Sequence, residues 1–183
     1  TAAVSGRTFK LEQAAVIFGS ITTKDGTPIH NSYVTVSAKA ASDVGYGAAY
    51  TDMNGNYRIN NLKAGKYTVK VSTTGYVEKV TSVRARKGES EELNLKLQLA
   101  GSISGQIRDV TTGLPVSYYT VRVRKESVTA TADVNGYYTI DGLAPGKYTL
   151  YINSTTYKTI TRSGVQVSAN KETKNINFEL EYK

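Results

Sequence analysis

The sequence predicts an all-β protein built from two consecutive copies of one structural unit. The stretch TDMNGNYRINNLKAGKYTVKV at 51–71 returns at 132–152 as ADVNGYYTIDGLAPGKYTLYI. Such self-similarity in a fixed frame is the signature of a repeat architecture. The matched pairs, each 81 positions apart, are Asp52/Asp133, Asn54/Asn135, Gly55/Gly136, Tyr57/Tyr138, Ile59/Ile140, Leu62/Leu143, Gly65/Gly146, Lys66/Lys147 and Tyr67/Tyr148. Thr, Val, Ile and Tyr are abundant and helical periodicity is nearly absent, which favours strands.

The repeated stretch predicts two turns that separate three strands. The Asn-Gly pairs at 54–55 and 135–136 favour tight turns, because both residue types tolerate a positive φ. Apolar and polar residues alternate after each Asn-Gly pair, and they alternate again after Gly65 and Gly146. This period of two is typical of half-buried strands.

An aspartate precedes each Asn-Gly pair, and it has two interpretations. The carboxylates of Asp52 and Asp133 can accept backbone N–H bonds and thereby fix the turn. Alternatively they begin a calcium site, because Asp-x-Asn-Gly resembles the start of an EF-hand loop. The bidentate Glu expected later in such a loop is missing, and no flanking helices are predicted.

The full pattern resembles the carboxypeptidase regulatory-like domain. It reads Asp-x-Asn-Gly-x-Tyr-x-Ile-x-x-Leu-x-x-Gly-x-Tyr-x-Val, with Gly-x-Ile and Gly-x-Pro upstream, and it covers nearly the whole chain twice. That family is similar in fold to transthyretin and to the CnaB-type repeats of bacterial surface proteins. The resemblance implies two consecutive seven-stranded antiparallel β-sandwiches, prealbumin-like or Ig-like. It also implies an accessory, stalk or binding module and not a catalyst.

We expect the repeats to occupy 17–99 and 100–183. Residues 1–16 are expected to be the last strand of a preceding repeat or an N-terminal extension, because Phe-Lys-Leu at 9–11 matches Leu-Lys-Leu at 95–97. The neighbouring repeats of the same chain are therefore its first expected partners.

The junction between the repeats is short, and one loop differs in length between them. Only residues 98–100 separate the repeats, without a Gly/Ser-rich or Pro-rich linker, which predicts restricted relative motion. The segment from the proline to the aspartate covers 24 positions in repeat 1, from Pro28 to Asp52, and 18 positions in repeat 2, from Pro115 to Asp133. The longer segment is a candidate binding loop, because surface loops tolerate insertions and often carry function.

The net charge of +8 is spread along the chain, with clusters only at 84–87 and 122–125. We favour a solvated strand face for these clusters, and attraction to an acidic polymer is the alternative. The basic residues are not interleaved with aromatic residues and form no helical motif, so we expect no nucleic-acid partner. No run of eighteen apolar residues is present, and we therefore expect no membrane insertion by this segment.

Catalytic constellations are missing from the sequence. The only histidine, His30, lies in a turn region beside Pro28, and there is no cysteine. No His/Cys metal cluster, Cys-His pair or disulfide can be formed, and no Gly-x-Ser-x-Gly occurs. We expect no enzyme activity, no cofactor and no metal.

The CnaB relatives raise the possibility of a Lys–Asn isopeptide crosslink promoted by a buried Glu. In that family the Glu lies on the strand that follows the Gly-x-Tyr turn, and the matching positions here are Val71 and Ile152. We therefore expect no crosslink.

Tyrosine, with fourteen copies, supplies the candidate binding residues. In repeat 2, Tyr118, Tyr137 and Tyr151 have outward parity, and Tyr137 and Tyr151 on successive strands are the better pair. Repeat 1 has Asn31, Asn56 and Lys70 at the same places, so the fold does not require aromatic residues there. One interpretation is strand propensity on an exposed face, and the other is a flat platform for sugars or a partner protein. Tyr46 and Tyr50, in the longer segment of repeat 1, form the second candidate site.

These observations predict a monomeric, non-catalytic segment of a secreted or cell-surface protein. Its expected role is that of a structural stalk or an adhesion and presentation module. The alternative is a carbohydrate-binding accessory module of an extracellular hydrolase, with glycans or another surface protein as partners.

Overall fold

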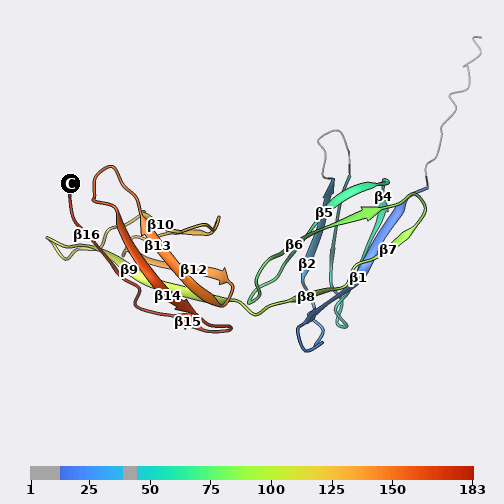
Figure 1. Ribbon diagram of the computed structural model, residues 1–183, viewed down its shortest axis with the longest axis horizontal. Coiled ribbons are helices and arrows are strands. Elements are labelled where there is room, and N and C mark those ends of the chain that lie inside the picture. The colour runs from blue at the N-terminus through green and yellow to red at the C-terminus, as the bar shows by residue number, and fades with distance from the viewer. Residues whose placement is uncertain (1–12, 39–44) are drawn as a thin grey trace, which may run out of the picture. The chain divides into compact units, whose positions relative to one another are not determined.

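The computed structural model describes residues 13–38 and 45–183 and divides into two compact units (Figure 1). The first unit holds the described residues up to Ser72 together with Lys79–Lys96, and the second holds Thr73–Glu78 and Leu97–Lys183. The described residues form no helix, and so they contain none that is long and apolar enough to cross a membrane. The predicted all-β class is confirmed.

The first unit consists of two four-stranded sheets that pack as a sandwich. One sheet has the order β4-β1-β7, with β8 also paired to β1, and the other has the order β3-β2-β5-β6. The strands are β1 (Ala15–Thr23), β2 (Tyr33–Ala38), β3 (Tyr46–Tyr50), β4 (Asn56–Leu62), β5 (Gly65–Ser72), β6 (Lys79–Ala85), β7 (Ser90–Glu92) and β8 (Leu95–Leu97).

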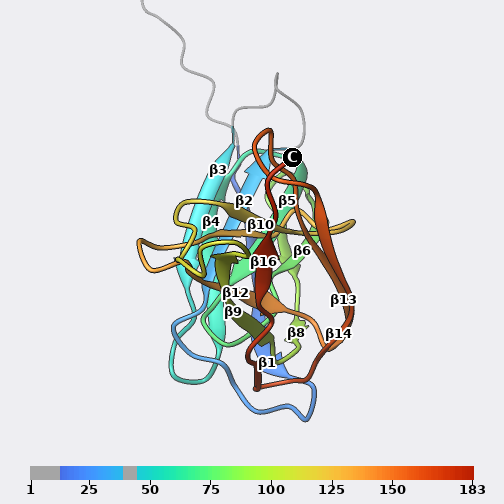
Figure 2. The same cartoon turned by 90° about the vertical axis from the view of Figure 1, so that its left-hand side faces the viewer.

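The second unit repeats this plan. Its sheets have the orders β12-β9-β15, with β16 also paired to β9, and β11-β10-β13-β14. Figure 2 looks onto this unit and shows β13 and β14 as a pair apart from β9 and β12. The strands are β9 (Gly101–Asp109), β10 (Thr120–Val123), β11 (Thr129–Thr131), β12 (Tyr137–Leu143), β13 (Gly146–Ile152), β14 (Ile160–Val167), β15 (Glu172–Thr173) and β16 (Phe178–Leu180).

The last strand of each repeat differs from the expectation of seven antiparallel strands. Two short strands stand in its place, β7 and β8 in the first unit and β15 and β16 in the second. Strand β7 runs parallel to β1, and β15 and β16 run parallel to β9. The first strand of each unit therefore has a neighbour near the end of that unit that points the same way.

A buried tyrosine is hydrogen-bonded to the break between the two short strands. Tyr138 projects into the core, and its hydroxyl donates to the carbonyl oxygen of Ile176 between β15 and β16. That oxygen lies against Gly105, where a Cβ atom would stand 2.1 Å from it. The same arrangement in the first unit uses Tyr57, Leu93 and Gly19.

An asparagine after each break continues the pairing with the first strand. Asn94 Oδ1 accepts a hydrogen bond from the Ser20 backbone nitrogen at 2.8 Å, and Asn177 Oδ1 accepts one from Gln106 at 2.9 Å. A side-chain amide thus replaces the backbone carbonyl that the kinked strand has turned away.

The other matched residues of the repeats also hold the fold. Tyr67 and Tyr148 are the tyrosines of the Gly-x-Tyr turns, and their hydroxyls donate to the carbonyl oxygens of Lys63 at 2.9 Å and Ala144 at 2.7 Å. This is the bond of a tyrosine corner, in which the hydroxyl returns to the backbone a few residues upstream. The core of the second unit includes Ile103, Ile107, Val121, Tyr138, Ile140, Leu150, Ile152, Val167, Phe178 and Leu180.

The segment 73–78 belongs to the second unit because it is bonded to the chain that leads into β9. The Val77 nitrogen donates to the Gln98 carbonyl at 2.8 Å, and the Ala100 nitrogen donates to the Gly75 carbonyl at 2.9 Å. The expected boundary between 99 and 100 therefore differs from these compact units by this segment and by residues 97–99.

Candidate binding surface

The outer face of the sheet β3-β2-β5-β6 carries a cluster of three tyrosines. Tyr33 and Tyr50 are cross-strand partners on β2 and β3, and their ring centroids are 4.9 Å apart. The hydroxyls of Tyr33 and Tyr46 lie 3.0 Å apart, within hydrogen-bonding distance. Tyr46 and Tyr50 are 67% and 62% exposed, and Tyr33 is 36% exposed. We call Tyr33, Tyr46 and Tyr50 the tyrosine cluster.

The hydrogen bond within the tyrosine cluster has an electrostatic consequence. It raises the pKa of Tyr33 above its ordinary value of 10.0, because the neutral hydroxyl is the form that the bond to Tyr46 favours. Tyr33 therefore keeps a neutral phenol group at physiological pH.

Small hydroxyl residues and basic residues share this face with the tyrosine cluster. Ser37 stands opposite Tyr46 on one side and Thr68 on the other, and Thr68 is paired with Ser82. Lys66 and Arg84 form the next outward pair, on β5 and β6. Lys70 also has outward parity. Among the described residues of these four strands, none of the outward positions is acidic.

The tyrosines predicted as a platform in repeat 2 do not share a face. Tyr137 lies on β12 and is paired with Gln106 of β9, whereas Tyr151 lies on β13 and is paired with Arg122 of β10. These strands belong to different sheets of the sandwich, so Tyr137 and Tyr151 project from opposite faces. The expectation that they are the better pair is wrong, because the chain crosses from one sheet to the other between β12 and β13.

Tyr118 lies before β10 in an unusual backbone conformation. Its φ is 63°, and 68% of the residue is exposed. Asn31, its counterpart in repeat 1, has a φ of 55°, and asparagine is far better suited than tyrosine to this left-handed region. Tyr118 therefore occupies a turn position at some conformational cost, and its outward direction cannot be derived from strand parity.

The carboxylates before the Asn-Gly turns are held by backbone N–H groups. Asp52 Oδ1 accepts from Asn54 and Asn56 at 2.9 and 2.8 Å, and Asp133 Oδ1 accepts from Asn135 and Tyr137, both at 2.8 Å. The glycines that follow, Gly55 and Gly136, both have a φ of 75°. Across the described residues, no three His, Cys, Asp or Glu side chains gather as a metal site would require.

A hollow of about 480 Å³ opens on the first unit between the sheet β4-β1-β7 and the edge strand β3. Its lining includes Phe18, Tyr50, Asp52, Arg58, Glu92 and Asn94. The Arg58 guanidinium lies 5.8 Å from the centre of the Phe18 ring and donates to Asn60, and the Asn94 amide donates to Glu92. Its polar groups are thus already bonded within the unit.

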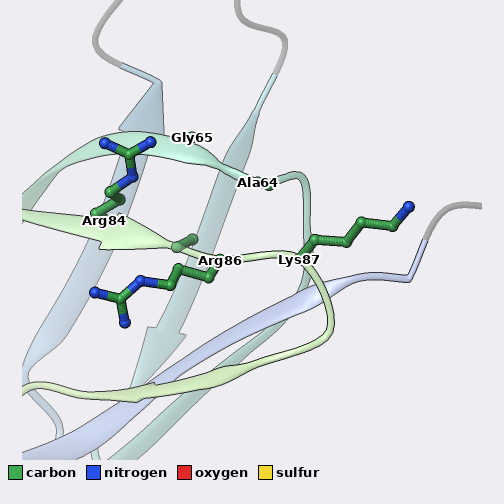
Figure 3. Close-up of a pocket in the computed structure, with 6 residues that line it drawn as sticks. Ala64, Gly65, Arg84, Arg86 and Lys87 are labelled. Atoms are coloured by element: carbon green, nitrogen blue, oxygen red, sulfur yellow. The ribbon is translucent and has the colours of Figure 1, made fainter.

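A second hollow, at the start of β5 and the end of β6, is basic (Figure 3). Figure 3 shows Arg84, Arg86 and Lys87 pointing away from one another. Arg86 Nη1 also donates to Glu91 at 2.8 Å and lies 3.4 Å from Glu89. These cations do not converge on one point, so the hollow lacks the geometry of an anion pocket.

The positions that would matter for an isopeptide crosslink are apolar and buried. Val71 and Ile152, the positions that the resemblance matches to the glutamate of the CnaB-type repeats, are 0% and 1% exposed. The absence of a crosslink stays a prediction.

The family model of the carboxypeptidase regulatory-like domain matches residues 16–98 and again residues 102–181. The chain is a tandem pair of carboxypeptidase regulatory-like domains. The family expected from the Asp-x-Asn-Gly to Gly-x-Tyr pattern is therefore confirmed.

One curated relative is Bacillopeptidase F of Bacillus subtilis, 30% identical over 115 residues. The match covers 55% of this chain and 8% of that protein. The matched part of the chain thus spans a small part of that relative.

Solved structures that are similar to this chain include a Bacillus anthracis protein and a pilin of Streptococcus agalactiae. The Bacillus anthracis TIE protein has a TM-score of 0.43 at 21% identity, over 93% of this chain and 34% of that chain. The minor pilin of Streptococcus agalactiae has a TM-score of 0.44 at 13% identity, over 92% of this chain and 96% of that chain.

Sequence reasoning found Tyr46 and Tyr50 but missed Tyr33. The signal was available, because Tyr33 of the first regulatory-like domain corresponds to Thr120 of the second, which pairs with Thr131 as Tyr33 pairs with Tyr50. A comparison of the two domains strand by strand would have marked Tyr33 as aromatic without a structural need.

Proposed function

We propose that this chain is a non-catalytic, load-bearing spacer and presentation segment of a secreted or cell-surface protein. One observation carries the proposal: in each unit the first strand has a parallel neighbour among the last strands of that unit. Val16 of β1 pairs with Ser90 of β7, and Ile107 of β9 pairs with Phe178 of β16, both in parallel.

This arrangement determines how tension acts on a unit. When the N-terminal end of the first strand and the C-terminal end of the last strand are pulled apart, two parallel neighbours slide past each other. Their interstrand hydrogen bonds are spaced evenly along the pair, so tension loads them together and not one after another. A segment held between a surface and a distal domain would experience tension in this way.

The residues shared by the two repeats support a structural role. Asp52, Tyr57, Tyr67 and their counterparts are engaged in hydrogen bonds that hold turns and strand breaks. The common part of the repeats is therefore scaffold, and the exposed tyrosines differ between repeats.

Single-molecule pulling from the two ends tests the proposal. We expect two discrete unfolding steps, each lengthening the chain by roughly 300 Å, because an extended residue spans at most about 3.6 Å. The control attaches handles through cysteines introduced at Lys66 and Arg84, a Cα pair at the open end of the β5–β6 hairpin, in a chain that has no cysteine of its own. That geometry peels bonds one by one and should yield at lower force. Equal forces in the two geometries would contradict a load-bearing role.

The tyrosine cluster favours a second function, that of a carbohydrate-binding accessory module. Aromatic rings provide apolar area for sugar faces, and their hydroxyls provide hydrogen bonds. The match to part of a peptidase chain supports an accessory position beside an enzyme. A glycan array probed with the intact chain tests this function, and binding that survives in the Tyr33→Thr/Tyr50→Thr variant would contradict the cluster as the site.

A further inference from the structure

We infer that the outer face of β3-β2-β5-β6 binds an acidic polysaccharide, with sugar rings on the tyrosine cluster and acidic groups on the basic residues of β5 and β6. The inference rests on the carbohydrate-binding function proposed above and specifies its ligand class. Three features of the face carry it, and each corresponds to one part of such a ligand.

The first feature is an aromatic area assembled in the folded state. Tyr33 and Tyr50 have their ring centroids 4.9 Å apart with an angle of 36° between the rings, and the hydroxyl contact holds Tyr46 to Tyr33. Mutual contact fixes the rings before a ligand arrives, which lowers the entropy cost of binding. Three large exposed tyrosines in contact also form an exposed apolar patch, and such patches commonly mark interaction sites.

The second feature is a strip of small hydroxyl residues beside the rings. Ser37, Thr68 and Ser82 follow one another across β2, β5 and β6 in a single row that begins at Tyr46. Hydroxyl groups both donate and accept hydrogen bonds, and so they suit the hydroxyls of a sugar. Their small size also keeps this strip lower than the tyrosine cluster.

The third feature is the charge of the face. Lys66 and Arg84 are exposed cross-strand partners at the end of the row next to the hydroxyl strip. Neighbouring like charges are unfavourable on a strand pair unless a counter-charge is supplied. The described outward positions of β3, β2, β5 and β6 supply no carboxylate, so a polymer that carries carboxylate or sulfate groups is the complementary occupant.

The second repeat provides an internal comparison. In its equivalent sheet, Thr120 and Thr131 replace Tyr33 and Tyr50, and their hydroxyls lie 3.4 Å apart. That sheet keeps two exposed basic residues, Arg122 and Lys147, at outward positions. Arg122 and Lys147 are thus a matched control within the same chain, because they are basic residues on a sheet face that has no tyrosine cluster.

Titration calorimetry of the intact chain tests the inference with three probes: polygalacturonate for carboxylates alone, heparin for sulfates together with carboxylates, and dextran as a neutral polymer. We expect binding to one or both acidic polymers, weakened by salt, and none to dextran. Tyr33→Thr/Tyr50→Thr and Lys66→Gln/Arg84→Gln should each reduce the affinity by about tenfold or more, as the loss of stacking or of charge pairing implies. The charge-matched control Arg122→Gln/Lys147→Gln should bind as the wild type does, and unchanged thermal unfolding verifies the fold of each variant.

Several outcomes would overturn the inference. If Arg122→Gln/Lys147→Gln weakens binding as much as Lys66→Gln/Arg84→Gln does, the affinity depends only on net charge and not on this face. If neither acidic polymer binds, an acidic polysaccharide is not the ligand. Binding to dextran that depends on Tyr33 and Tyr50 but not on Lys66 and Arg84 would preserve the carbohydrate function and refute its acidic ligand. Tighter binding to single-stranded DNA than to either polysaccharide would assign the face to nucleic acid.

Discussion

Buried tyrosine hydroxyls determine where the last strand of each repeat breaks. Tyr57 and Tyr138 each place a ring in the core and a hydroxyl at a carbonyl of the strand break. Burial raises the pKa of both phenols, so they remain hydrogen-bond donors far into the alkaline range. Each kink is therefore held by a buried hydroxyl bond.

Removing one of these hydroxyls should destabilise its repeat. Tyr138→Phe leaves the Ile176 carbonyl without its donor, and we expect a loss of about 1–3 kcal/mol in the free energy of unfolding. Tyr137→Phe, at the exposed neighbour, should change it by less than about 0.5 kcal/mol. Urea denaturation of both variants measures the difference, and equal effects would show that the hydroxyl bond contributes nothing.

Glycine at the strand break is required for space. A Cβ at Gly105 would stand 2.1 Å from the Ile176 oxygen, a backbone atom that can move only if the break moves. We expect Gly105→Ala to destabilise the repeat by about 1–3 kcal/mol, as overpacking does. The control is Gly146→Ala, whose Cβ would meet its nearest atom, in the Tyr148 ring, only at 3.8 Å. A stability ranking in which the control is the worse variant would contradict the steric argument.

Asp109 should make the second repeat sensitive to acid. Its Oδ1 accepts hydrogen bonds from the backbone of Thr111 and Thr112 and from the Thr112 hydroxyl. The Thr112 backbone bond holds the pKa of Asp109 below its ordinary value of 3.8. The carboxylate therefore stabilises the fold fully above that value, and its contribution is lost as the pH falls through the lower pKa of the folded state.

Asp109→Asn tests this contribution, because an amide keeps the acceptor oxygen but has no charge to lose. Denaturation midpoints measured from neutral pH down to about pH 2 should fall less in the variant than in the wild type. The exposed carboxylate of Asp141 provides the control, and Asp141→Asn should follow the wild-type curve. Parallel curves for the wild type and Asp109→Asn would contradict the prediction.

At the scale of strands, the sequence predicted which residues face the core but not which sheet they join. Alternation correctly placed Tyr138, Leu150 and Ile152 inward, since period two follows from the pleat itself. The assignment of β12 and β13 to different sheets depends on where the chain crosses after the turn at 144–146. Alternation carries no information about that crossing, and Tyr137 and Tyr151 were therefore paired wrongly.

The contact between Tyr33 and Tyr50 could not be predicted from the sequence either, because it depends on the register of β2 against β3. A strand pair has many registers that keep the same inward face, and the intervening loop is longer in repeat 1 than in repeat 2. The turns at Asn54-Gly55 and Asn135-Gly136 could be predicted because the residues that determine them are adjacent in sequence.

A charge placed in either core should unfold the unit that contains it. Val69 of β5 and Leu150 of β13 are both 0% exposed, and burying an unpaired carboxylate costs several kcal/mol, comparable to the stability of a small domain. We expect Val69→Asp and Leu150→Asp each to lose about half of the β signal in far-UV circular dichroism. A spectrum with substantial helix in the wild type would contradict the fold.

At the scale of the whole molecule, we expect no covalent bond beyond those of the linear chain. The intact mass should equal the sequence mass of 19.8 kDa, because Val71 and Ile152 provide no acid to promote an isopeptide bond. Each such bond would lower the mass by about 17 Da through loss of ammonia, a covalent change that must be counted explicitly. Mass spectrometry of the folded protein measures this directly, and a deficit of that size would refute the argument.

The parallel pairing of first and last strands also decides when a repeat can finish folding during synthesis. Val16 must wait for Ser90, 74 residues later, and Ile107 must wait for Phe178, 71 residues later. Until then β1 and β9 have a partner on one edge only, although each ends as a central strand of its sheet. Contacts of such long sequence separation form slowly, and an open strand edge invites pairing with another chain. A pause in translation shortly before the last strands of a repeat would thus leave a nearly complete sheet whose central strand has one exposed edge.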